Sequence, residues 1–269
     1  MYQVLLLLSV RLHYRSTSRV HRNIKPPHHT HCSMSSTKQT YPYKSLHIDY
    51  FQIGAHIGNS HNDPIYNEPM SNKNIILVEP VPFLYELLKH NYQTRMRNNE
   101  IEFLNIAVSD YDGTINMTAP SKDNDFDAHP FFLNQMASTT DKYIKQLNFQ
   151  ERYPTFQFET ITVPCRTLTT IVKERGITSI DHLIVDTEGH DETILRAFDF
   201  QQVKPKRITF ENAYMDGILP PSKDPPSTLH RPKYRAFLQF LASHGYRVVS
   251  ENTEDTVVEW TPVADAEST

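Results

Sequence analysis

The sequence has few of the residues that mark specialised protein classes. Its 269 residues include only 2 cysteines, Cys32 and Cys165, and these cannot build a disulfide scaffold. Lysine and arginine number 27 against 31 acidic residues, so the formal net charge is −4. This near-neutral balance indicates neither a nucleic-acid polyanion nor a membrane surface as a partner. Only 7 glycines occur, so a glycine directly after a strand is more informative than usual.

Acidic residues are missing from the start of the chain. None occurs before Asp49, whereas Arg, Lys, His and Ser are frequent in this stretch, which opens with an apolar run over residues 4–10. Such a leader is typical of an organelle transit peptide, and the apolar run is also compatible with a secretory signal or with a disordered extension. The run is too short to cross a bilayer, which takes about 20 apolar residues.

The leader also contains a group of metal-binding side chains: His28, His29, His31 and Cys32. Because a disordered leader does not hold such side chains in place, we expect no metal site there. We expect residues 1–45 to be a disordered leader or targeting segment, residues 46–262 to be one domain, and residues 263–269 to be a disordered tail. The chain is long enough for one large α/β domain.

From residue 46 onward the sequence alternates apolar strands with amphipathic helices. Strands are predicted over residues 47–53, 74–78, 101–108, 114–117, 159–163, 182–185, 207–210, 246–250 and 256–260. Helices are predicted over residues 82–95, 168–175, 191–198 and 232–243, and Asp63-Pro64 predicts a further helix start. Asp112-Gly113 predicts a hairpin turn, and residues 119–156 show no regular pattern.

This alternation predicts an α/β fold. Repeated strand–helix units produce a doubly wound, mostly parallel, Rossmann-like sheet with helices on both faces. The last two strands follow the final helix and are separated by a short polar turn, so we expect them to form a C-terminal antiparallel hairpin. In such a sheet, ligands bind at the carboxyl ends of the strands where the strand order reverses.

The first two strand ends carry the residues expected to hold a cofactor. Gly54, Ala55, His56 and Gly58 follow the first strand. Glycines there let the backbone approach a ligand closely, although a glycine pair after a strand is as often simple turn geometry. Glu79 ends the second strand, where a carboxylate is placed to accept both hydroxyls of a ribose.

Two later strand ends carry the residues expected to do chemistry. Asp186, Glu188 and His190 follow an aliphatic strand within a few positions, and each is a candidate base for deprotonating a hydroxyl. Asp186 or Asp191 could instead simply cap the helix that follows, which one residue of this run could do but not all of them. Glu211 ends the next strand and is a candidate second base. The first three could also bind a divalent ion, but we expect a metal-free site.

In these pieces the sequence resembles the FkbM-type methyltransferase family, a class I group, over roughly residues 51–258. The matching segments are residues 51–58, 63–64, 77–82, 105–110, 163–168, 185–191 and 210–211. The resemblance implies S-adenosylmethionine as cofactor, held by residues 54–58 and Glu79, with Ala107 beside the adenine and Asp186 beside the methionine part. Sheets of this class end in an antiparallel strand, as predicted here.

The resemblance also implies where the methyl acceptor binds. Glu188, His190 and Glu211 would lie near it, and Ser138 would line the site from the variable loop. The implied activity is O-methylation of a small-molecule or carbohydrate acceptor. Nitrogen acceptors usually meet an Asn or Asp followed by two prolines, and Asp186 lacks these prolines. The chain departs from the usual family pattern at Gln52, at His56 and Ile57, and at Val185.

Two other functions compete with this interpretation. A dinucleotide-binding oxidoreductase would carry a G-x-G-x-x-G pattern, which residues 54–58 do not supply. A degenerate protein that keeps the methyltransferase fold without turnover would bind the cofactor weakly or not at all. The sequence contains no obvious nucleophile, which suits methyl transfer because the donor is already activated and the protein mainly aligns the reactants.

Overall fold

The computed structural model describes residues 46–60, 63–68, 71–139, 149–216 and 231–261. The predicted leader with its His28, His29, His31 and Cys32 cluster, and the predicted tail over residues 263–269, lie outside these ranges. None of the described helices is long and apolar enough to span a membrane.

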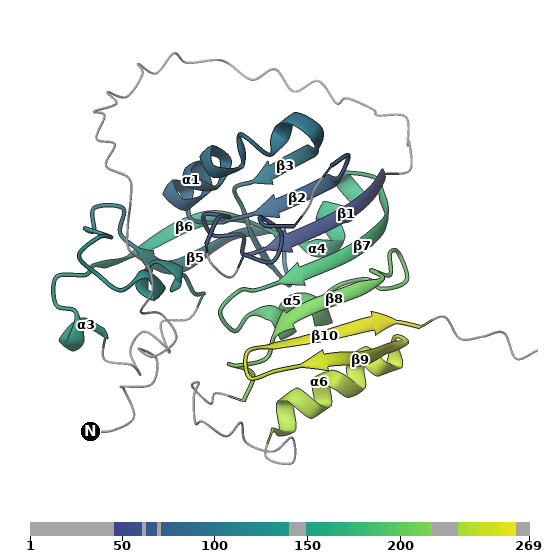
Figure 1. Cartoon of the computed structure of the whole chain (residues 1–269). Coiled ribbons are helices and arrows are strands. Elements are labelled where there is room, and N and C mark those ends of the chain that lie inside the picture. The colour runs from purple at the N-terminus through teal and green to yellow at the C-terminus, as the bar shows by residue number, and fades with distance from the viewer. Residues whose placement is uncertain (1–45, 61–62, 69–70, 140–148, 217–230, 262–269) are drawn as a thin grey trace, which may run out of the picture. The chain divides into compact units, whose positions relative to one another are not determined.

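The described chain forms ten strands and several short helices (Figure 1). The strands are β1 (Leu46–Ile53), β2 (Asn74–Val78), β3 (Glu100–Leu104), β4 (Ala107–Ser109), β5 (Gly113–Pro120), β6 (Phe158–Thr167), β7 (Ile177–Val185), β8 (Arg207–Glu211), β9 (Tyr246–Glu251) and β10 (Asp255–Trp260). The helices are α1 (Pro82–Tyr92), η1 (Met96–Asn98), η2 (Phe131–Gln135), α3 (Phe149–Arg152), α4 (Leu168–Glu174), α5 (Asp191–Arg196) and α6 (Pro232–Ser243).

Seven strands form one sheet in the order β3-β2-β1-β7-β8-β10-β9. The pairs β1–β2, β2–β3, β1–β7 and β7–β8 are parallel, whereas β10 is antiparallel to both β8 and β9. The chain moves outward from β1 to β3 and then crosses back to β7, so the strand order reverses between β1 and β7. This arrangement confirms the predicted mostly parallel sheet with a C-terminal antiparallel hairpin.

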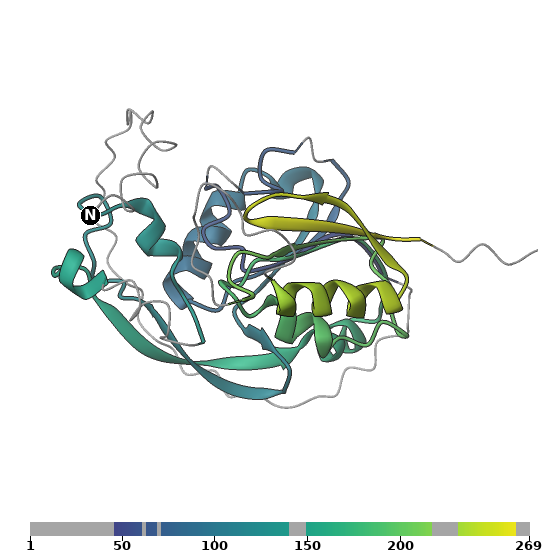
Figure 2. The same cartoon turned by 90° about the horizontal axis from the view of Figure 1, so that it is seen from below.

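The two faces of this sheet are covered unequally. Buried aliphatic and aromatic side chains of α4, α5 and α6 pack with β1, β7 and β8 in the largest core cluster. On the other face, Leu88 and Tyr92 of α1 pack against Ile75 and Leu77 of β2. Figure 2 shows α6 running alongside the β9–β10 hairpin. Helices therefore pack on both faces of the parallel strands and hold the carboxyl ends of these strands in place.

A second sheet of three strands, in the order β4-β6-β5, corrects two predictions. The predicted strand over residues 101–108 is two strands in different sheets. Between them, the Asn105 side chain donates to the backbone oxygens of Glu79 (2.8 Å) and Pro80 (3.0 Å), which holds a bend where the chain leaves the large sheet. The predicted turn at Asp112-Gly113 does not pair β5 with the strand before it, because β5 pairs with β6 instead.

The Asp63-Pro64 segment also differs from its prediction. Residues 63–68 form turns and not a helix. Asp63 does act as a cap, because its Oδ1 accepts from the backbone N–H groups of Ile65 (2.9 Å) and Tyr66 (2.5 Å). The cap predicted at Asp63 is therefore present, but the turns that follow it do not continue into a helix.

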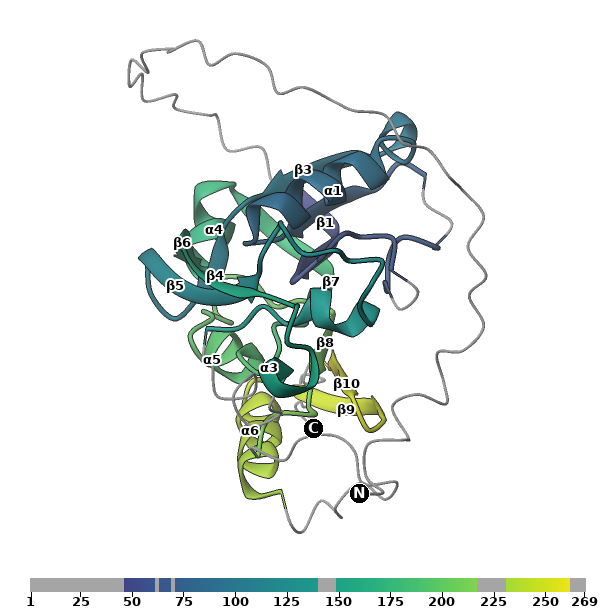
Figure 3. The ribbon, with the colours of Figure 1, turned by 90° about the vertical axis from the view of Figure 1, so that its left-hand side faces the viewer.

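Figure 3 looks onto the carboxyl ends of the parallel strands. The small sheet and the segment that carries η2 lie at this end of the molecule, next to the ends of β1 and β7. The polar residues that follow the parallel strands therefore face structure contributed by the middle of the chain. This is the place where the sequence predicts a ligand site.

Candidate active site

A cavity that is partly open to solvent lies at the carboxyl ends of β1, β2 and β7. It lies at the predicted reversal of strand order. Its walls come from three strand ends of the large sheet, from β4 and β5 of the small sheet, and from the segment after η2. The lining residues are Ile53, Gly54, His56, Val78, Glu79, Pro80, Leu84, Ile106, Ala107, Val108, Met117, Gln135, Ala137, Thr139, Asp186, Thr187, Glu188 and His190.

Gly54 occupies a position that only glycine can fill. Its φ is +85°, and a Cβ there would lie 1.7 Å from the backbone oxygen of Asp186. The missing side chain lets the ends of β1 and β7 approach each other at the cavity wall. The Gly54 amide is used internally, because it donates to the Val78 oxygen at 3.0 Å.

The other two small residues of this turn do not line the cavity. Gly58 has φ +73°, and a Cβ there would lie 2.4 Å from side-chain atoms of Leu88 and Tyr92, so this glycine makes room for helix α1. Ala55 is buried among the core residues beneath α1. Their contribution to the site is therefore the shape of the turn, through packing that the sequence pattern alone does not reveal.

Glu79 connects the ends of β1 and β2. Its side chain is almost completely buried, at 4% exposure. Oε1 accepts from the Val81 N–H at 2.8 Å, and Oε2 accepts from the His56 N–H at 2.9 Å. Burial raises the pKa of Glu79 to about 7, although both N–H groups act in the opposite direction. Each oxygen keeps a second lone pair that a ligand hydroxyl could use.

His56 has the strained backbone and the unpaired nitrogen expected of a ligand contact. Its φ of 48° is uncommon for a residue with a side chain. Its Nε2 lies 3.2 Å from the Asn134 oxygen, which can only accept, so Nε2 carries the proton. Burial lowers the pKa of His56 to about 4, so the ring is neutral. Its Nδ1 is buried and has no hydrogen-bond partner among the described residues.

Asp191 holds the ends of β7 and β8 together. It is fully buried, and its Oδ2 accepts from the Thr187 hydroxyl at 2.6 Å and the Thr187 N–H at 3.2 Å. Its Oδ1 accepts from the Glu211 N–H at 3.0 Å. The alternative that Asp186 or Asp191 caps α5 does not hold, because the capping position belongs to His190, whose side chain makes no cap bond. Asp191 instead braces two strand ends.

Carboxylates gather around this brace. Asp186 and Glu188 line the cavity, and the side of Asp186 that faces the cavity is open to solvent. The protein around Asp186 raises its pKa well above the usual range, first by desolvation and then by the negative charges of Glu188 and Asp191. Burial also raises the pKa of Glu188 to about 7, against a hydrogen bond from Tyr214. Glu188 has φ 53°, a strained conformation that costs about 1–2 kcal/mol.

Glu211 lies beside the cavity and not in its wall. Burial, followed by the charges of Glu188 and Asp186, raises the pKa of Glu211 well above its usual range. Its Oε2 is buried and has no hydrogen-bond partner among the described residues. The predicted strand-end acids are thus brought together, with Glu211 behind the two that face the cavity.

His190 lies in the cavity wall between the two sheets. Its Nε2 is 2.8 Å from the Ser109 hydroxyl of β4, and its Nδ1 is 3.5 Å from the Thr139 hydroxyl. Burial lowers the pKa of His190, so the ring is neutral at neutral pH. The sequence identified His190 as a candidate base, but it missed Ser109 and Thr139 because both contacts are far apart in the chain.

The remaining predicted residues lie on the small sheet. Ala107 of β4 lines the cavity, as does Met117 of β5, which the sequence missed. Ser138 does not line it, because its backbone pairs with Thr118 in both directions at 2.9 Å and the residue is buried. Its neighbour Thr139 takes the place at the wall.

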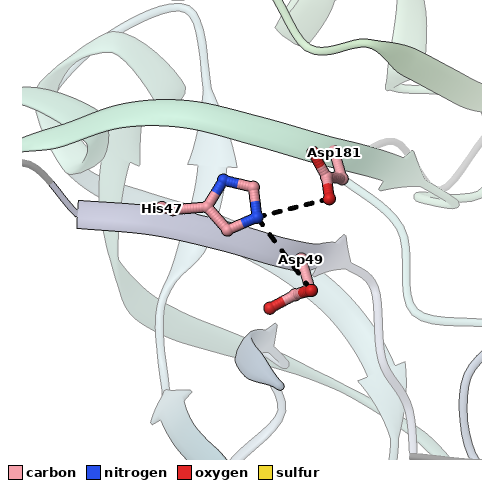
Figure 4. Close-up of side chains that lie close together, drawn as sticks. All are labelled: His47, Asp49 and Asp181. Atoms are coloured by element: carbon pink, nitrogen blue, oxygen red, sulfur yellow. Dashed lines mark ion pairs between the residues drawn. The ribbon is translucent and has the colours of Figure 1, made fainter. Parts of the chain in front are cut away.

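A separate group of polar side chains lies on β1 and β7, away from this cavity. His47 Nε2 lies 3.3 Å from Asp181 and 4.0 Å from Asp49 (Figure 4). Lys73 pairs with Asp49 and Lys206 pairs with Asp181, each at 2.7 Å. The two ammonium groups neutralise the two carboxylates, so the group is an ion-pair network on the sheet surface.

Comparison with known proteins identifies a family. The model of the methyltransferase FkbM domain matches residues 52–248, which is most of the chain. No curated protein matches the sequence.

Three solved structures resemble the fold at low scores. A precorrin-6y C5,15-methyltransferase from Geobacter metallireducens is 15% identical, with a TM-score of 0.33, and the match covers 80% of this chain and 82% of the methyltransferase chain. A proposed tRNA methyltransferase from Streptococcus pneumoniae, in complex with S-adenosyl-L-methionine, is 10% identical with a TM-score of 0.33 and coverages of 82% and 71%. A fibrillarin pre-rRNA processing protein from Methanococcus jannaschii is 12% identical with a TM-score of 0.35 and coverages of 82% and 70%.

Proposed function

Because the chain belongs to the FkbM methyltransferase domain family, we propose that it uses S-adenosylmethionine to methylate a hydroxyl group on a small-molecule or carbohydrate acceptor. The observation that carries the choice of a hydroxyl is the composition of the cavity wall. Carboxylates and a neutral histidine face the cavity together, and the described part of the wall contains no lysine, arginine or cysteine. Such groups can take a proton from a hydroxyl.

The residues of the cavity fit the cofactor. Glu79 has free lone pairs at the end of β2, where it would accept from the ribose hydroxyls. The unpaired Nδ1 of His56 is an acceptor beside it. Asp186 lines the same cavity, and the positive charge of the methionine part would lower the pKa of Asp186 and favour its charged form. When bound, S-adenosylmethionine supplies a methyl group on a sulfonium, which is already activated for transfer.

The acceptor is proposed to bind on the side of Glu188 and His190. Both face the cavity, and Glu211 stands behind Glu188 with an unpaired oxygen. Glu188 and His190 can orient a hydroxyl by accepting its hydrogen bond and can then take its proton. Ala107 and Met117 of the small sheet line the same cavity, and their apolar surface would help to keep water away from the reacting atoms.

The test is a transfer assay with the full chain. S-adenosylmethionine with a labelled methyl group is offered with neutral glycosides and small alcohols, and with matched amines. We expect label in a methyl ether, identified by mass spectrometry and NMR. Asp186→Asn should lose most of the transfer, while Asp127→Asn, at an exposed aspartate, should retain it. Label found only on nitrogen would contradict the proposal.

A further inference from the structure

The contact between His190 and Ser109 extends to a third residue. Ser109 is fully buried at 1% exposure, and its hydroxyl lies 2.8 Å from His190 Nε2. The same hydroxyl donates to Asp110 Oδ1 at 3.1 Å, and Asp110 is exposed. Neither Ser109 nor Asp110 lines the cavity, so both can act only through the imidazole.

The direction of these hydrogen bonds determines the tautomer of His190. A serine hydroxyl has one proton, and a carboxylate can only accept. Because Ser109 donates its proton to Asp110, its oxygen must accept from His190. Nε2 therefore carries the hydrogen, and in a neutral ring Nδ1 has none. Burial lowers the pKa of His190, which keeps the ring neutral.

The free nitrogen is the one next to the cavity. Nδ1 lies 3.5 Å from the Thr139 hydroxyl, and both His190 and Thr139 line the wall. This contact is long, at the limit of a hydrogen bond, so a closer donor can replace it. An acceptor hydroxyl bound in the cavity is such a donor.

We propose that Asp110 and Ser109 are positioning residues that fix His190 as the Nε2–H tautomer, so that Nδ1 is the base for the acceptor hydroxyl. This inference rests on the proposed function. The acceptor O–H bond breaks, its proton bonds to Nδ1, and its electron pair stays on the oxygen. That oxygen bonds to the methyl carbon, and the sulfur keeps the electron pair of the broken S–C bond. The imidazolium then returns its proton to solvent.

The tautomer can be measured without cofactor or acceptor. The full chain is labelled with ¹⁵N in its histidine rings, and long-range ¹⁵N–¹H correlation spectra are recorded at neutral pH. His190→Gln assigns the signal among the 14 histidines. We expect a single Nε2–H tautomer in the parent protein. In Ser109→Ala and Asp110→Ala the two nitrogen shifts should move toward each other, as in a mixture of tautomers.

Asp127→Ala, at an exposed aspartate in another loop, is the matched control and should leave the spectrum unchanged. Ser109 is buried, so Asp110→Ala preserves the test if Ser109→Ala does not fold. An Nδ1–H tautomer in the parent protein, or an unchanged tautomer in Asp110→Ala, would overturn the proposal.

The transfer assay tests the role of the base. Asp110→Ala should lower kcat about tenfold with KM unchanged, because loss of general-base catalysis acts on the chemical step. A shifted tautomer with unchanged kcat would overturn the role of Nδ1. If the parent protein transfers no methyl group at all, the proposed function fails, while the tautomer measurement still decides whether Asp110 and Ser109 orient the ring.

Discussion

Replacing Glu79 by glutamine tests whether the residue that connects the ends of β1 and β2 also binds the cofactor. The carboxylate accepts two backbone N–H groups, from Val81 and His56, at 2.8 and 2.9 Å. Glutamine has the same shape but only one acceptor oxygen, so one of these N–H groups would face an amide N–H. A buried donor left without a partner costs about 1–3 kcal/mol of unfolding free energy.

The same change should weaken cofactor binding. Glu79→Gln removes one acceptor for the ribose and disturbs the turns after β1 and β2, so we expect S-adenosylmethionine to bind about 10- to 100-fold less tightly, or about 1.4 kcal/mol per factor of ten. Chemical denaturation measures the stability and calorimetric titration measures the affinity. Glu86→Gln, at an exposed glutamate on α1, is the control and should change stability by less than about 0.5 kcal/mol.

Two results would refute this reasoning. Unchanged stability in Glu79→Gln would show that the two backbone bonds do not brace the strand ends. Reduced stability with unchanged affinity would show that the carboxylate is a structural brace with no contact to the ribose.

Three further changes have defined outcomes. Gly54→Ala should destabilise the fold by at least ~2 kcal/mol, because the new Cβ would lie 1.7 Å from the Asp186 oxygen at a φ of +85°; an unchanged melting temperature would contradict this geometry. Asp191→Asn should lower the unfolding free energy by about 1–3 kcal/mol, because one of the two braced strand ends loses its acceptor; denaturation with urea measures it, and an unchanged midpoint would contradict the brace. The ligand-free protein should lose stability as pH rises from about 4.5 to about 7, because five carboxyls bind more protons in the folded state than in the unfolded state: desolvation raises the pKa to about 7 for Glu79 and Glu188, to about 6 for Asp191, and well above the usual range for Asp186 and Glu211. They outnumber the histidines His56, His182 and His190, whose lowered pKa values act in the opposite direction; stability that rises across this window would contradict the desolvation of these carboxyls.

The position of the site could be predicted from the sequence because it follows from the topology of the sheet. Parallel strands end at one edge of a sheet, so the polar residues after Ile53, Val78 and Val185 had to meet. The structure brings Gly54, Glu79 and Asp186 to one cavity for this reason. Such a prediction needs only the alternation of strands and helices, which is a local property.

What the sequence did not predict depends on contacts between distant segments. The split after Leu104 is held by the Asn105 side chain on the backbone of Glu79 and Pro80, a contact with the preceding strand end that no local pattern encodes. Gly58 makes room for Leu88 and Tyr92 of a later helix, so glycine is required at this position by helix packing and not by the approach of a ligand.

The small sheet shows the same limit. Strand β5 pairs with β6, which begins at Phe158, and not with its neighbour in the chain. Ser109 could be recognised as part of the site only after β4 had been placed beside His190. Ser109 and His190 are 81 positions apart, so no local sequence pattern predicts their contact.

The most direct test of the central claim is calorimetric titration of the purified full chain with S-adenosylmethionine, and with NAD and NADH in parallel. The account predicts micromolar binding of S-adenosylmethionine and no binding of either dinucleotide. Binding of NADH without S-adenosylmethionine would contradict it in favour of an oxidoreductase. No binding of any of the three would indicate a protein that keeps the methyltransferase fold without its cofactor, and His56 and Ile57 would be the first residues to replace.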